Sequence, residues 1–216
     1  EVIHNYAGSI GGAGTGAAGL SVTVNSISGD TKATVEDSTL AAAGNETDEI
    51  TVYSKVKDAD LDNGIVSKST WGAGTALKDK RTSTKIKGLA VDASSSHSIS
   101  SDLATVGGAG TFEIMGTVNV NTVSGSTTAS ISDSTGTHSI NNGSTGAVAV
   151  KATDYTITAA FVGEAGGSGT AAIGAASDAE VFNRDVKAKV GYTGTTAGPQ
   201  MSVTSGSFSV NAENEQ

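Results

Sequence analysis

The chain of 216 residues contains no cysteine and one proline, Pro199, and only 4% of its residues are aromatic. The absence of cysteine excludes disulfides, thiol catalysis and cysteine-ligated zinc. With so few aromatic residues, a core has to be filled by valine, isoleucine, alanine and leucine, which suits thin stacked layers. The 29 glycines indicate many tight turns.

The chain also has little positive charge and no long apolar run. Its 13 lysines and arginines are outnumbered by 22 acidic residues, so the net charge is −9 and the isoelectric point is about 4.7. This balance argues against a nucleic-acid partner. No apolar run reaches membrane-spanning length, and the residues after Glu1 do not resemble a signal peptide. We interpret residues 1–216 as a single segment of a longer chain.

An internal repeat organises the sequence. Ser21–Thr39 (SVTVNSISGDTKATVEDST) recurs at Thr117–Thr135 (TVNVNTVSGSTTASISDST), a shift of 135 − 39 = 96 positions. The turn-forming tetrapeptide Gly12–Thr15 (GAGT) recurs at Gly72–Thr75 and Gly108–Thr111, with a weaker echo at Gly163–Gly166. Repetition of one unit predicts a stacked array in which each unit buries its apolar face against its neighbours.

A second set of markers gives the period. Val52, Val91, Val150 and Val210 follow one another at offsets of 91 − 52 = 39, 150 − 91 = 59 and 210 − 150 = 60. We therefore predict a repeat of about 58 residues, with copies at about 8–63, 64–103, 104–158 and 159–216. The second copy is expected to be truncated by the loss of one coil of about 20 residues between Ala76 and Thr82.

Within each copy, apolar residues alternate with serine and threonine, which predicts short half-buried strands separated by polar turns. A helix over Asp178–Val190 is disfavoured, because its central VFNRDV contains few strong helix formers. The alternation predicts that these residues point inward: Val22, Val24, Val35, Val52, Val91, Val118, Val120, Ile131, Val150 and Val210. The expected fold is all-β, a right-handed parallel β-helix (β-solenoid) of about ten rungs.

The repeat resembles the passenger repeats of large bacterial type V secreted adhesins, the filamentous-haemagglutinin-like and autotransporter proteins. The matching positions are Gly19, Ser21, Val22, Val24, Asn25, Ile27, Thr31, Ala33, Val35, Ser38, Ala43, Gly44 and Ile50–Val52 in one copy, and Gly116–Asp133 with Val148–Ala152 in another. The resemblance implies a structural or adhesive stalk segment of a secreted virulence-associated adhesin on the bacterial cell surface. It also implies a parent chain attached to the outer membrane through a domain that is missing here.

That resemblance implies binding to an unspecified surface protein or glycan of a host or partner cell. Two alternatives remain open: a β-helix polysaccharide lyase or hydrolase, and a self-assembling extracellular filament subunit that associates end to end through unpaired strand edges. Clustered arginine, lysine, aspartate and aromatic residues are lacking, which argues against an enzyme. We predict no catalytic residue, no cofactor and no metal site, and the ligand-binding residues stay unidentified.

Several groups of residues are candidate sites. Asp58, Asp60 and Asp62 resemble the start of a calcium loop, but Gly64 is one place late and Ser69 replaces the bidentate glutamate. Whether these three aspartates hold calcium stays open. The three histidines are expected to be exposed and have no carboxylate at metal spacing: His4, His97 and His138. Two carboxylate pairs could in principle act as a glycosidase pair: Glu46 with Asp48, and Asp178 with Glu180. A charged corner is expected at Lys78–Arg81.

Overall fold

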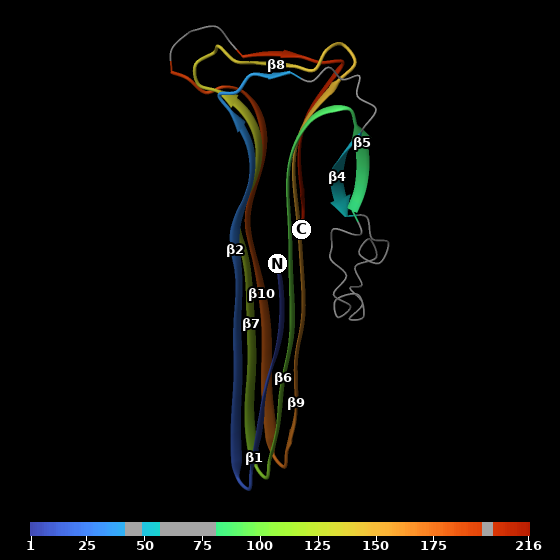
Figure 1. Ribbon diagram of the computed structural model, residues 1–216. Helices are drawn as coiled ribbons and strands as arrows, with labels where there is room; N and C mark the ends of the chain where they lie inside the picture. The colour runs from blue at the N-terminus through green and yellow to red at the C-terminus, as the bar shows by residue number, and fades with distance from the viewer. Residues whose placement is uncertain (42–48, 57–80, 196–200) are drawn as a thin grey trace. The chain divides into compact units, whose positions relative to one another are not determined.

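A computed structural model describes residues 1–41, 49–56, 81–195 and 201–216. Over these residues the chain forms twelve strands and no helix. Figure 1 draws the strands as arrows. The segment Asp178–Val190 belongs to a strand, so the prediction against a helix is confirmed. The prediction of an all-β chain with parallel sheets is also confirmed.

Most of the strands belong to two parallel sheets. The larger sheet has the order β1 (Val2–Ala13), β6 (Gly88–Ala109), β9 (Ala147–Ser168) and β12 (Ser207–Glu215). The second sheet has the order β10 (Ala171–Tyr192), β7 (Phe112–Asp133) and β2 (Gly16–Glu36). Two-residue turns join β1 to β2, β6 to β7 and β9 to β10.

Two smaller sheets complete the described residues. Three short parallel strands have the order β11 (Ser202–Thr204), β8 (Ser139–Asn141) and β3 (Leu40–Ala41). The strands β4 (Ile50–Val56) and β5 (Arg81–Ile86) pair antiparallel.

The strand registers set the length of one repeat. Ser207 pairs with Ala147, an offset of 207 − 147 = 60, whereas Val2 pairs with Ser98, an offset of 98 − 2 = 96. These parallel neighbours thus stand one whole repeat apart, and rungs of about 20 residues are not confirmed. The longer offset exceeds the shorter by 96 − 60 = 36 positions, and β4 and β5 lie in this interval. The predicted loss of a coil between Ala76 and Thr82 falls largely outside the described residues, so this truncation and the copy boundaries stay predictions.

The chain divides into two compact units, which are described separately. Unit 1 comprises Glu1–Ser28, His97–Ser124 and Thr156–Asn183, and unit 2 comprises Gly29–Ser96, Gly125–Tyr155 and Arg184–Gln216.

Unit 2 has an apolar core. Its buried cluster consists of Val91, Ala93, Ala129, Ile131, Ile140, Val148, Val150 and Ala152, and Val35 packs against it. Val52 of β4 is also buried. The predicted inward positions of Val35, Val52, Val91, Ile131 and Val150 are therefore confirmed. Val210 pairs in register with buried Val150 and therefore points to the same inner face, and it is 42% exposed because β12 is the edge strand of its sheet.

Unit 1 has the opposite pattern along β2 and β7. Ser21, Thr23 and Asn25 are buried, whereas Val22 and Val24, between them, are 58% and 68% exposed. On β7 the buried residues are Thr117, Asn119 and Asn121, and Val118 and Val120 are only half-buried. The inward assignments of these four valines are therefore wrong.

The continuity of the strand explains this reversal. β2 alternates between buried or half-buried and exposed positions along most of its length, with odd-numbered residues on the inner side. Because successive side chains of a strand point to opposite faces, a strand that turns Ala33 and Val35 inward must also turn Asn25 and Thr23 inward. The apolar residues of this repeat change from even to odd positions within a single strand.

We predict that Val22→Asp changes the free energy of unfolding by less than about 1 kcal/mol, because the side chain is already in water. Ile131→Asp should cost roughly 3–5 kcal/mol, because it places a carboxylate without a partner in the apolar core of unit 2. Urea unfolding of both full-length variants, followed by circular dichroism, measures this difference. Equal destabilisation by the two substitutions would mean that the side of β2 that carries Val22 and Val24 is buried.

Candidate functional site

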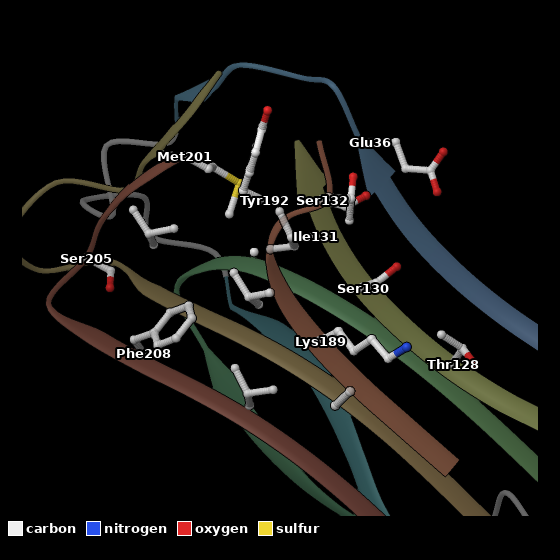
Figure 2. A pocket seen from close by; sticks show the side chains of 16 residues that line it. Glu36, Thr128, Ser130, Ile131, Ser132, Lys189, Tyr192, Met201, Ser205 and Phe208 are labelled. Carbon is white, nitrogen blue, oxygen red and sulfur yellow. The ribbon is translucent and has the colours of Figure 1, made fainter. Parts of the chain in front are cut away.

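An open groove of about 1150 Å³ lies in unit 2 and is shown in Figure 2. The apolar part of its lining includes Ile131, Val190, Met201, Val203 and Phe208, and Glu36 and Lys189 are its charged residues. Val190, Met201 and Val203 also pack against the core cluster of unit 2. The groove is thus the place where this core opens beside β11 and β12, and its lining suits contact with an apolar segment better than chemistry on a polar substrate.

The corner after β7 is built around one buried carboxylate. Asp133 Oδ1 accepts the backbone N–H groups of Thr135 and Gly136, both at 2.9 Å, and Asp133 Oδ2 accepts the N–H of His138 at 2.9 Å. His138 Nδ1 lies 3.0 Å from Asp133 Oδ1. Burial opposes ionisation of Asp133, but the hydrogen bonds from His138, Thr135 and Gly136 outweigh it and hold the pKa of Asp133 well below its usual range.

Asp37 completes this corner from the preceding repeat copy. Its Oδ1 accepts the backbone N–H of Ser134 at 2.6 Å, and these bonds to Ser134 hold the pKa of Asp37 below its usual value. Oxygen and nitrogen atoms of Asp37, Asp133 and His138 lie within 4.8 Å of one another, the one such group found among the described residues. Because the two carboxylates already accept backbone and hydroxyl donors, the cluster stabilises the conformation of this corner.

His138 is therefore not the unpaired exposed histidine that its sequence context predicted. The signal for this corner was the run Asp133-Ser-Thr-Gly, since aspartate bonds the backbone of the following residues in turns. His97 is 5% exposed and also contradicts the prediction of an exposed side chain, whereas His4 is exposed as predicted.

A buried ion pair occupies the interior of unit 2. Arg184 and Asp154 both have fully buried side chains, and Arg184 Nε donates to Asp154 Oδ2 at 3.0 Å. Arg184 Nη1 donates to the carbonyl oxygen of Gly29 at 2.9 Å, and Nη2 donates to Thr127 and Ser95 at 3.2 and 3.1 Å. Five strands thus contribute to one network, in which the charges of both partners are compensated.

This network depends on a glycine. Gly125 has φ 118°, and a Cβ there would lie 2.0 Å from the carbonyl oxygen of Gly29 and 2.7 Å from Arg184 Nη1. Any larger residue would displace the guanidinium and strain the backbone. Burial opposes ionisation of Asp154, but the hydrogen bonds and charge of Arg184 prevail and keep the pKa of Asp154 below its usual value.

Unit 1 contains a ladder of asparagines between its two sheets. Asn5 Nδ2 donates to Asn25 Oδ1 at 2.9 Å, and Asn25 Nδ2 donates to Asn121 Oδ1 at 2.8 Å. Asn121 Nδ2 then donates to Glu180 Oε1 at 2.8 Å, and Asn119 Nδ2 donates to Asp178 Oδ1 at 2.7 Å. The amide donors of this polar interior are thereby used by neighbouring strands.

The candidate carboxylate pair Asp178 and Glu180 thus lies on the inner face of β10. Burial raises the pKa of Glu180, and the hydrogen bond from Asn121 opposes this shift. A raised pKa is a property of general acids, but each carboxylate of this pair accepts an asparagine of the ladder. The geometry therefore indicates a structural role for the pair.

The glycine tetrapeptides form a stack of turns in unit 1. A Cβ at Gly110 would lie 2.1 Å from the carbonyl oxygen of Gly14, and a Cβ at Gly169 would lie 2.3 Å from that of Gly110. The third member of the series is therefore Gly167–Thr170 (GSGT), and the expected echo at Gly163–Gly166 is wrong. The offset of 169 − 110 = 59 matches the spacing of the asparagine ladder between β7 and β10.

The remaining sequence candidates lie outside the described residues. These are Asp58, Asp60, Asp62, Glu46, Asp48, Gly72–Thr75 and Lys78–Lys80, while Arg81 begins β5.

No family model, no curated protein and no solved structure matches this chain. Over the part of the chain that the structure describes, no helix is long and apolar enough to cross a membrane.

We predict that acid unfolding depends on Asp154. Its pKa is lowered in the folded chain from an ordinary value of 3.8, so ionised Asp154 stabilises the fold above about pH 4, and this contribution is lost as the pH falls through the lowered value. Asp154→Asn should therefore reduce the loss of stability between about pH 5 and pH 2, measured by urea unfolding at each pH.

A double-mutant cycle provides the control for this ion pair. Asp154→Leu alone should cost roughly 3–5 kcal/mol, because it leaves the Arg184 guanidinium buried without its anion. Arg184→Met in the same chain should recover much of that loss, because no buried charge remains. Additive losses in the double variant would contradict a coupled pair.

Proposed function

We propose that this chain is a structural stalk segment of a secreted bacterial surface adhesin, built as a closed right-handed parallel β-helix. In this proposal the segment holds a binding region of the parent protein away from the cell or contacts host or partner-cell surfaces along its side walls. The parent chain would be attached to the outer membrane by a domain outside these residues.

One observation carries this proposal: equivalent residues of successive repeat copies lie against each other. In β12 and β9, Ser207 pairs with Ala147 and Val210 with Val150, so the register is constant along the pair. In β1 and β6 the register is again fixed, with Gly12 paired to Gly108. When each repeat copy pairs with the copy before it, every added copy lengthens the stack, and a stalk requires such lengthening.

The use of the polar side chains also supports a structural role. Asp133, Asp154, Asp178 and Glu180 all accept hydrogen bonds from residues of neighbouring strands or corners. These carboxylates accept donors from within the protein, so they are not directed at a shared external position where a substrate could react. A polysaccharide lyase or hydrolase is therefore the weaker alternative.

End-to-end self-assembly has one specific observation in its favour. In the sheet of order β10-β7-β2, the edge strands β2 and β10 are 21 and 22 residues long. Long edge strands present N–H and C=O groups to any further strand. These edges would pair with the next repeat copy in a longer chain or with another molecule.

We predict that duplication of residues 88–146 gives a folded chain whose strand content per residue and melting temperature are at least those of the parent. The duplicated segment runs from the first residue of β6 to the residue before β9, so the added copy finds its register on both sides. Circular dichroism and thermal unfolding test this. Duplication of residues 88–136 is the matched control, because it adds an incomplete repeat and should lower the melting temperature.

We also predict no turnover of pectin, glycosaminoglycan, peptidoglycan or ester substrates by the purified chain. Product analysis of each incubation measures this. Cleavage that disappears on Asp178→Asn or Glu180→Gln would overturn the stalk assignment in favour of an enzyme.

A further inference from the structure

The outer face of the β10-β7-β2 sheet in unit 1 is apolar and exposed. Its most exposed large side chains are Leu20, Val22, Val24, Ile114, Ile173 and Val181, at 68%, 58%, 68%, 48%, 56% and 48%. Ile114 belongs to the central strand β7, and the others belong to β2 and β10. We name this surface the valine face.

The valine face carries no charge. Its strand segments 16–28, 112–124 and 171–183 contain only three charged residues, Glu113, Asp178 and Glu180. Glu113 is 1% exposed, and Asp178 and Glu180 accept the inward-facing asparagines, so all three lie on the inner side of their strands. A contiguous apolar sheet surface without charge is unusual on an isolated soluble chain and marks an interaction surface.

The surroundings of the valine face restrict what can cover it. All 13 lysines and arginines of the chain lie outside unit 1, whose acidic residues are Glu1, Asp102, Glu113, Glu164, Asp178 and Glu180, a net charge of −6. An anionic bilayer would be repelled by such a unit. A partner recognised by complementary charge would find none on this face.

We propose that the valine face is covered by the valine face of a second copy of this chain, sheet against sheet. Parallel strands in register present their side chains in regular rows, and two such faces pack at about 10 Å with interdigitating side chains. Two identical faces can pack against each other here, because neither face carries a charge that would meet the same charge on its partner. This lateral pairing goes beyond the stalk role and does not depend on it.

The size of the face sets the strength of pairing. Three strand segments, each about nine residues long, cover about 430 Å², from a rise of about 3.3 Å per residue and a strand spacing of about 4.8 Å. Two faces then bury about 900 Å² in total, which is at the low end for specific association. The pairing is weak and reversible. Unit 1 of each copy is negatively charged, so the two copies repel each other, and added salt strengthens the pairing by screening this repulsion.

Sedimentation velocity of the 216-residue chain, from about 1 µM to about 1 mM, tests the proposal in that affinity range. We expect a monomer–dimer equilibrium that shifts toward dimer when sodium chloride is raised from about 0.05 M to about 0.5 M. Val24→Lys and Val24→Glu should each abolish the dimer, because either charge would be buried against its symmetry mate. Since Val24 is 68% exposed, both variants keep their circular dichroism spectrum.

Ile10→Lys is the matched control. Ile10 is 91% exposed but lies on β1, in the other sheet, so its replacement removes an exposed apolar side chain without touching the valine face. This variant should dimerise like the parent. A neutral change, Val24→Ser, should weaken the dimer by roughly a hundredfold, about tenfold for each of the two apolar side chains that leave the interface.

Four outcomes would overturn the proposal. A monomer at every concentration and salt would show that no second copy covers the face. A dimer retained by both Val24 variants would come from strand edges. A dimer lost with Val24→Glu but strengthened by Val24→Lys would be held by charge. Binding of the parent chain to vesicles of anionic phospholipid, lost in both Val24 variants, would assign the face to a membrane.

Discussion

The structure depends on one constraint: in a parallel sheet in register, a residue is stacked on its equivalent in the previous repeat copy. Every position of the repeat therefore has to tolerate a neighbour of the same kind at about 4.8 Å. Asparagine meets this demand because each amide both donates and accepts, as Asn25 and Asn121 do. Two stacked carboxylates would repel, and in the described interior of unit 1, Asp178 and Glu180 lie against Asn119 and Asn121.

The same constraint explains how the chain accommodates the buried guanidinium of Arg184. Gly125 follows Gly29 by 96 positions and Arg184 follows Gly125 by 59, the offsets of the asparagine ladder, so the three occupy one column of the stack. The two glycines leave room for the arginine side chain, which bonds the carbonyl oxygen of Gly29 and the carboxylate of Asp154. The thin interior thus accommodates a large side chain because the two stacked positions in the same column are glycines without side chains.

The sequence was sufficient to predict an all-β chain with parallel pairing of its repeat copies, but not the length of the strands or which side of each strand is inside. The match between Ser21–Thr39 and Thr117–Thr135 fixed the shift of 96 that the strand pairs display. Alternation defines two faces, and hydrophobicity alone assigned the inner one, which succeeded for Ile131 and failed for Val24. The recurrence of asparagine at positions 25 and 121 was the available signal that a polar ladder fills the interior.

The length of the strands was misjudged for a related reason. Gly29 and Gly125 resemble corner residues in sequence, but the strands β2 and β7 continue through them, since the glycines serve the column beside Arg184. Strands of 21 and 22 residues replace the short strands that the turn signals predicted. The corner at Asp133 likewise could not be predicted from the sequence alone, because Asp37, which completes it, comes from the preceding repeat copy.

The stack of glycine turns gives the molecule a direction. The Cα of Gly169 faces the carbonyl oxygen of Gly110, and that of Gly110 faces the carbonyl oxygen of Gly14, while nothing lies within 4 Å of the corresponding position at Gly14. One side of the stack therefore has room for a side chain, and the other side exposes a carbonyl oxygen against which only glycine fits. The two sides of the stack are therefore chemically distinct surfaces. A further turn would meet a different surface on each side, so the stack of repeat copies is polar.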